Sequence, residues 1–398
     1  MKSRVRRLFP CLAALILAVG CAPGSPLPVE SEEPIVSIGF GVTIEEGRLY
    51  FDNEADCLVF YDFALETNMP LCSVPNCKHD SDSCPAYFPA RNVDKYAIYR
   101  NKLYSWMLDY STNSLSLSES DKNGLNRSAL LTVTGRVPPA TATYVEGKVF
   151  YEAFNEEMDE ERGLIKRTDN VACYDFEEGK EVILGSDRVS YFGGLRIMHY
   201  YDNKLYYYFN QLKGEYDEST FNPLDYEFGT DYVDTYNMVI DLQSGTEEPF
   251  DTISGSVVLE FKGKYATYGA KTATGYDIIL QDLDTNETKI VASNPEEPYP
   301  AIFDSKVFTK KMTTAYETEP YMEFYDIASG NMEKVFFQFP RNQSILIMDE
   351  TSDRFIASVA YYGDDNETQV GNAESVWVYK EDFYNGVWSP VLISDRGI

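Results

Sequence analysis

Apolar and polar residues alternate along the chain in short runs, and one recurring phrase introduces seven of these runs. In each copy a polar residue, a small or turn-forming residue and a Lys or Arg lead into an apolar, mostly aromatic segment, as at 146–151 and 202–207. The basic residues stand 42 to 60 residues apart and are Arg48, Lys102, Lys148, Lys204, Lys264, Lys306 and Arg354. Repeats of this length with strand-type alternation predict stacked sheet units, and they favour a β-propeller.

Each repeat predicts four antiparallel strands. An apolar strand precedes the phrase, a second follows it, a third often ends at an Asp, and a short fourth strand follows a turn. Five such residues are Asp62, Asp175, Asp241, Asp282 and Asp326. We expect them to accept backbone N–H bonds in the turns, which is a structural role. The prediction is an all-β fold, a propeller of seven four-stranded blades, with 35–40 or 391–394 helping to close the ring.

The long connections fall between the second and third strands of a repeat, or between repeats, so they emerge on one face of the ring. Insertions gathered on one face mark it as the expected binding face. The longest, 210–235, places five aromatic residues among seven acidic ones: Tyr216, Phe221, Tyr226, Phe228 and Tyr232. These aromatics suit sugars, cationic peptides or divalent ions, or they pin the loop to the ring as a small core. A second acidic loop, 155–169, is expected to be solvated.

The first twenty residues combine a basic start with a short apolar run, which is typical of a secretory signal and too short to span a bilayer as a mature helix. Small residues then precede Cys21, as in the lipobox of bacterial lipoproteins. We therefore expect 1–20 to be a lipoprotein signal, Cys21 to be lipidated, 22–34 to be a flexible tether, and 35–398 to form one propeller domain. The alternative is an ordinary signal peptide with an incidental Cys21.

Acidic residues outnumber basic ones by 64 to 34, giving a formal net charge of −30. Such a surface repels nucleic-acid backbones and anionic lipid headgroups. The expected partners are therefore the membrane, through the lipid anchor, and a glycan, peptide or surface protein of unknown identity. We expect the protein to be exported and anchored to the outer face of the cytoplasmic membrane.

One segment, 72–84, gathers Cys72, Cys77, His79 and Cys84, which are ligands of the right chemistry for a tetrahedral structural zinc site. Its spacing is not that of a standard zinc finger, and export favours a disulfide staple instead. The segment is too long for a simple blade crossover, so a metal or a disulfide is expected to order it. The imidazole of His79 favours the metal.

No recognisable catalytic motif is present in the sequence. It lacks a nucleophile elbow, a phosphate-binding glycine loop and a zinc-protease helix motif. His199 lies in a strand pattern and is expected to be a packed residue. We assign no catalytic residue and expect a binding or interaction module. The alternative is a carbohydrate-active hydrolase or lyase that uses carboxylates on the long-loop face.

The segment 70–79, continued by Cys84, Pro85 and Ala86, resembles a segment of exported lipoproteins from Gram-positive anaerobic gut bacteria. Those proteins carry a propeller-type domain of unknown function, likened to the propellers of lipoprotein-receptor-related proteins. The resemblance extends to the lipobox and the repeated phrase. It implies surface location and a propeller fold, and it brings no catalytic residues.

Overall fold

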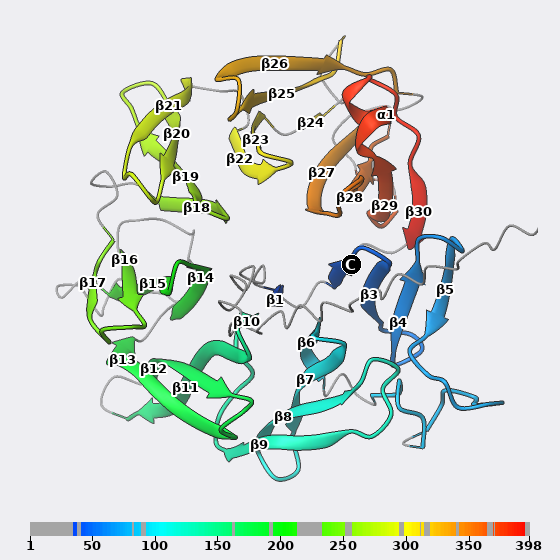
Figure 1. Ribbon diagram of the computed structural model, residues 1–398, viewed down its shortest axis with the longest axis vertical. Helices are drawn as coiled ribbons and strands as arrows, with labels where there is room; N and C mark the ends of the chain where they lie inside the picture. The colour runs from blue at the N-terminus through cyan, green and yellow to red at the C-terminus, as the bar shows by residue number, and fades with distance from the viewer. Residues whose placement is uncertain are drawn as a thin grey trace, which may run out of the picture. The chain divides into compact units, whose positions relative to one another are not determined.

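The computed structural model describes residues 35–37, 41–81, 83–88, 93–160, 164–190, 194–212, 233–250, 257–293, 298–310, 312–313, 319–339, 342–363, 369 and 371–394. All of them belong to the compact unit Glu33–Ile398. Their strands form seven antiparallel sheets arranged as blades around a ring (Figure 1), which confirms the predicted seven-bladed propeller. Among these residues the helix is α1 (Lys380–Tyr384). No helix in the described ranges is long and apolar enough to cross a bilayer.

The blades use consecutive strands, ordered from the inner strand to the outer one. Blade 1 comprises β2 (Val42–Ile44), β3 (Gly47–Asp52), β4 (Cys57–Asp62) and β5 (Thr67–Pro70); blade 2 comprises β6 (Val93–Tyr99), β7 (Lys102–Asp109), β8 (Ser114–Asp121) and β9 (Ser128–Thr134). Blade 3 comprises β10 (Ala142–Val145), β11 (Lys148–Asp159), β12 (Leu164–Asp175) and β13 (Lys180–Ser190); blade 4 comprises β14 (Leu195–Tyr201), β15 (Lys204–Leu212), β16 (Val233–Asp241) and β17 (Glu247–Pro249).

The remaining three blades follow the same order. Blade 5 comprises β18 (Val257–Lys262), β19 (Tyr265–Lys271), β20 (Tyr276–Asp282) and β21 (Thr288–Ser293). Blade 6 comprises β22 (Pro298–Phe303), β23 (Lys306–Lys310), β25 (Tyr321–Asp326) and β26 (Asn331–Phe336). Blade 7 comprises β27 (Gln343–Glu350), β28 (Arg354–Tyr361), β29 (Glu374–Tyr379) and β30 (Val391–Ser394), and the short β24 (Met312–Thr313) adds to its inner edge.

The recurring phrase forms the tight turn between the first and second strands of a blade. Both residues of the turns at 146–147 and 202–203 have positive φ, as the primed hairpin turns require. The Lys after the turn pairs with the Asp that ends the third strand; Lys306 Nζ lies 2.6 Å from Asp326. The same Asp326 accepts the backbone N–H of Ser329. The expected structural role of the five Asp residues is confirmed, because the other four also accept backbone N–H bonds in their turns.

Apolar side chains join each blade to both of its neighbours. In the described residues, seven buried apolar clusters each combine side chains from two adjacent blades, one for each junction of the ring. Consecutive residues of a strand point to opposite faces, so Leu49 packs towards blade 2 and Tyr50 towards blade 7. Alternate side chains of one strand therefore pack into the two junctions on either side of its blade.

Blade 7 meets blade 1 through side chains. Asn68 Nδ2 donates to the carbonyl of Ile393 in β30 at 2.9 Å, and Trp377 Nε1 donates to the Tyr61 hydroxyl at 3.3 Å. Strand β30 thus contributes to ring closure, as expected, from within its own blade. The other candidate, β1 (Ile35–Ser37), pairs instead with β10 of blade 3.

The direction of β1 fixes where the N-terminal segment meets the ring. Ile35 lies opposite Tyr144, near the turn that follows β10, and Ser37 lies opposite Ala142 at the other end of that strand. The chain therefore enters β1 at the face that carries the two-residue turns, which we call the short-turn face. The opposite face, with the connections between second and third strands and between blades, is the long-connection face.

Two expectations about loops are corrected. The acidic segment 155–169 is mostly an extension of the β11–β12 hairpin, paired as far as Asp159 opposite Leu164. Glu157 pairs across the hairpin with Lys166 at 2.7 Å. The connection between the third and fourth strands is long in blade 7, where it carries α1, and Phe383 of that helix is buried in the core shared with blade 6.

Candidate metal centre

The Cys–His loop, which we define as residues 72–85, leaves and rejoins the outer part of blade 1. Two backbone hydrogen bonds of Leu58 close the base of the loop. Leu71 donates its N–H to the carbonyl of Leu58 at 2.8 Å, and Leu58 donates its own N–H to the carbonyl of Ala86 at 2.9 Å. Tyr87 then bridges Cys57 in antiparallel fashion. The loop is part of the connection between β5 and β6, as predicted, and it lies between blades 1 and 2.

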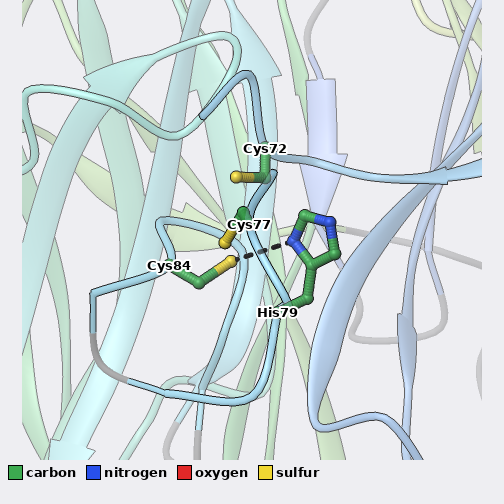
Figure 2. Close-up of side chains that lie close together, drawn as sticks. All are labelled: Cys72, Cys77, His79 and Cys84. Atoms are coloured by element: carbon green, nitrogen blue, oxygen red, sulfur yellow. Dashed lines mark hydrogen bonds between the residues drawn. The ribbon is translucent and has the colours of Figure 1, made fainter. Parts of the chain in front are cut away.

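The loop brings its four candidate ligands together (Figure 2). One ligand atom from each of Cys72, Cys77, His79 and Cys84 lies within 4.8 Å of all the others. The Nδ1 atom of His79 lies 3.2 Å from the Cys84 sulfur. Tetrahedral ligands at about 2.3 Å from a zinc ion are about 3.8 Å apart, so a small closure of the side chains would complete the site. This Cys3His cluster could hold a metal ion.

Backbone N–H groups point at all three sulfurs, each from two residues further along the chain. Val74 donates to the Cys72 sulfur at 3.4 Å. The N–H of His79 bonds the Cys77 sulfur, and the N–H of Ala86 bonds the Cys84 sulfur. Such bonds favour the thiolate form, which is the form that binds metals. The loop backbone therefore places one N–H donor beside each of the three sulfurs that could bind a metal.

The thiols of the cluster differ in their electrostatic surroundings. The hydrogen bond from the His79 N–H lowers the pKa of Cys77. Burial raises the pKa of Cys84 to about 12. A bound dication deprotonates a coordinating thiol outright, so a metal would offset the burial of Cys84. Three of the four ligands are half-buried and Cys84 is buried, which leaves the cluster partly accessible from solvent.

The other two described cysteines lie outside the cluster, and all five are free thiols in the structure. Cys57 is buried in blade 1, and its sulfur contacts the carbonyl of His79 at 3.3 Å. Cys173 is buried in the apolar cluster between blades 3 and 4, and burial raises its pKa to about 12. Cys173 is thus a packing residue.

The expected role of His199 is confirmed. Its side chain is 6% exposed and its ring stacks on Phe261 at 5.2 Å between centroids. Its Nε2 atom lies 2.7 Å from the carbonyl of Gly263 in blade 5. Burial lowers its pKa to about 4, so it is neutral at neutral pH. It links blades 4 and 5.

Six predicted site residues lie outside the described ranges. They are Cys21, Tyr216, Phe221, Tyr226, Phe228 and Tyr232. The strands that flank the aromatic insertion are described: β15 and β16 pair as far as Leu212 opposite Val233. The insertion therefore starts from a paired stem on the long-connection face.

The residues of blade 2 that contact the Cys–His loop were not predicted from the sequence. Asn123 Nδ2 donates to the Ser73 hydroxyl at 3.0 Å, and Arg127 donates to the carbonyl of Pro85. Both belong to the turn between β8 and β9. No local pattern marks them, because the contact depends on how two blades stack.

No protein-family model and no curated protein matches the chain. Solved structures share its fold. The β-propeller domain of the Trilobed protease from Pyrococcus furiosus is 10% identical, with a TM-score of 0.50 over 90% of this chain and 99% of that chain. The uncharacterized protein lmo1340 from Listeria monocytogenes EGD-e is also 10% identical, with a TM-score of 0.48 over 77% of this chain and 86% of that one. At such identities the likeness concerns the fold alone.

Proposed function

We propose that the protein is an extracytoplasmic binding module, anchored by a lipid on Cys21, that holds a glycan, peptide or surface protein at its long-connection face. The observation that carries this proposal is the asymmetry of the ring. Two-residue turns occupy one face in most blades, while the stem of the aromatic insertion belongs to the other. A rigid scaffold with its insertions on one face is the usual plan of a binding surface.

The course of β1 supports the same orientation. Because Ile35 lies opposite Tyr144 at the short-turn face, a tether that ends at Ile35 would join the ring at that face. Residues 22–34 reach at most about 45 Å when fully extended and about 20 Å on average as a flexible coil. A lipid on Cys21 would then hold the short-turn face towards the membrane and present the long-connection face outwards.

The charge of the chain narrows the class of ligand. A formal net charge of −30 favours cationic or neutral partners over anionic ones. Aromatic rings next to carboxylates, as at Tyr226 and Phe228 with Asp225 and Glu227, bind sugars or basic side chains. We therefore place neutral glycans and basic peptides ahead of phosphorylated or sulfated ligands.

Glycan-array and basic-peptide binding, followed by a turnover assay on each hit, tests the function. We expect Tyr226→Ala with Phe228→Ala to weaken binding about tenfold or more. The control is Leu65→Ala, which changes a residue 65% exposed in a turn of the short-turn face, and it should bind normally. Hydrolysis or elimination of a bound glycan would show that the protein is an enzyme and would overturn the binding-module proposal. Separately, Cys21→Ala should release the protein from membranes.

We further infer that Cys72, Cys77, His79 and Cys84 hold a structural zinc ion. Three thiolates and one imidazole complete a tetrahedral shell and leave no position for substrate. Elemental analysis of protein purified without chelator should give one zinc per chain, and Cys84→Ser should lose it. Cys173→Ser removes an equally buried thiol outside the cluster and should keep the metal. Absence of zinc together with oxidised thiols in the wild type would favour the disulfide staple.

A further inference from the structure

The Cys–His loop is packed between two blades, although both of its ends belong to blade 1. Its outer side contacts the turn 122–127 of blade 2. Besides the bond from Asn123 to Ser73, the turn brings Gly124 so close that a Cβ there would stand 3.0 Å from Pro85 Cβ and 3.1 Å from the Leu71 carbonyl. Gly124 also has φ +80°, so a residue with a side chain there would be strained in its backbone and crowded against the loop.

Arg127 is the cation of this contact. Its guanidinium lies over the ring of Phe88 at 4.1 Å and donates to the carbonyl of Pro85. Phe88 is 1% exposed and belongs to the apolar cluster between blades 1 and 2. The Nε atom of Arg127 is buried and has no hydrogen-bond partner in the described part of the chain. Burial lowers the pKa of Arg127, and the charge of the nearby Cys84 opposes that shift.

The charge of the proposed site explains why a buried cation stands there. A dication with three thiolates and a neutral imidazole carries one net negative charge. Partly buried, such a charge needs a compensating partner. Arg127, whose guanidinium bonds the carbonyl of Pro85 next to Cys84, would supply it from the adjacent blade.

We propose that the metal centre is an inter-blade clamp: the bound ion orders the Cys–His loop, and Arg127 of blade 2 balances the charge of its thiolate shell. The clamp rests on the proposed zinc site and adds a positioning residue that sequence spacing does not show. Metal binding and the docking of blade 2 on blade 1 are therefore coupled, so each strengthens the other.

Zinc affinity tests the role of Arg127. Competition with a chromogenic chelator should show that Arg127→Met binds zinc 10- to 100-fold more weakly than the wild type, which is the range for lost outer-shell partners. Arg127→Lys, which keeps the charge without the stacking, should fall between the two. The matched control is Arg136→Met, which removes an ion pair to Glu181 between blades 2 and 3 and should leave the affinity unchanged.

Hydrogen exchange gives a second readout that does not depend on a folded Arg127 variant. Removing zinc from the wild type should raise exchange in 72–88 and also in 122–127, and leave the equivalent turn of blade 5, 283–287, unchanged. Asn123→Ala should reproduce part of the change in the loop without touching a ligand. Stoichiometric zinc with unchanged affinity in Arg127→Met, or with unchanged exchange in 122–127, overturns the clamp and leaves the zinc site standing. A wild type that binds no zinc overturns both.

Discussion

The junction between blades 1 and 2 and the junction between blades 3 and 4 are held together in different ways. Between blades 3 and 4, the apolar cluster contains twelve buried residues, all from regular strands. Between blades 1 and 2 it contains seven, and one of them, Phe88, comes from the return of the Cys–His loop. The junction between blades 1 and 2 thus depends on a segment that forms no strand or helix at its described residues, 72–81 and 83–85.

A buried carboxylate completes the junction between blades 3 and 4. Glu152 in β11 is 1% exposed and accepts the N–H groups of Thr141 and Ile197, each at 2.8 Å, as well as the Thr141 hydroxyl. The single proton of the Thr141 hydroxyl is shared between Glu152 and the carbonyl of Ile197, which lies 3.0 Å from the hydroxyl oxygen. Here fixed polar groups satisfy one another within the fold. Between blades 1 and 2 the proposed zinc ion would supply the equivalent order, and this is the difference that mutations can expose.

The largest effect is expected at Glu152. Glu152→Ala leaves two buried N–H groups without an acceptor, each worth about 1–3 kcal/mol, so the free energy of unfolding should fall by about 4 kcal/mol. Glu152→Gln keeps one acceptor oxygen and should lose less. Glu157→Ala, in the same strand but with its carboxylate exposed, is the control and should change stability by less than about 0.5 kcal/mol. Urea denaturation measures all three, and a Glu152→Ala loss below 1 kcal/mol would contradict the account.

Metal removal should act on the other junction. A cross-link over the thirteen residues 72–84 stabilises a fold by about 3 kcal/mol in the chain-entropy model, and chelation should remove about that much. Thermal unfolding with and without chelator measures the loss, and exchange at Thr141 and Ile197 should stay unchanged. If chelation instead raised hydrogen exchange evenly in all blades, the metal would not act as a local cross-link of the Cys–His loop.

The sequence predicts the blades well because their cause is local. A turn such as Asp202-Asn203 needs two residues that tolerate positive φ, and the Lys after it meets an Asp one hairpin later. The four cluster ligands also lie close together in the chain. Arg127 is missed because it stands 43 residues after Cys84 and meets the loop only through blade stacking. The hairpin at 155–169 was not predicted because a segment with many charged residues is typical of a loop. In the structure these residues lie on two paired strands.

Acid should weaken the junction between blades 4 and 5, where His199 is buried. The pKa of His199 is about 4 in the folded state against an ordinary value of 6.5, so the folded protein binds fewer protons than the unfolded one. The contribution of neutral His199 to the free energy of unfolding is complete above pH 6.5 and is lost as the pH falls towards 4. At pH 5 the loss from this group is about 2 kcal/mol. His199→Gln should show a shallower decline between pH 7 and pH 5, and a parallel decline would contradict the assignment.

The smallest effect is expected from the surface charges at the blade 1–2 junction. Lys122 of the blade 2 turn lies 3.8 Å from Glu46, and both side chains are in contact with solvent, Lys122 at 37% and Glu46 at 65% exposure. Exposed ion pairs contribute about 0–1 kcal/mol, so Lys122→Ala should change the free energy of unfolding by less than about 0.5 kcal/mol, with or without metal. Its neighbour Asn123 bonds the loop directly, and Asn123→Ala should cost about 1 kcal/mol in the metal-bound protein and little once the metal is removed. Equal losses for the two variants would show that general surface contacts, and not the ordered loop, hold blade 2 in place.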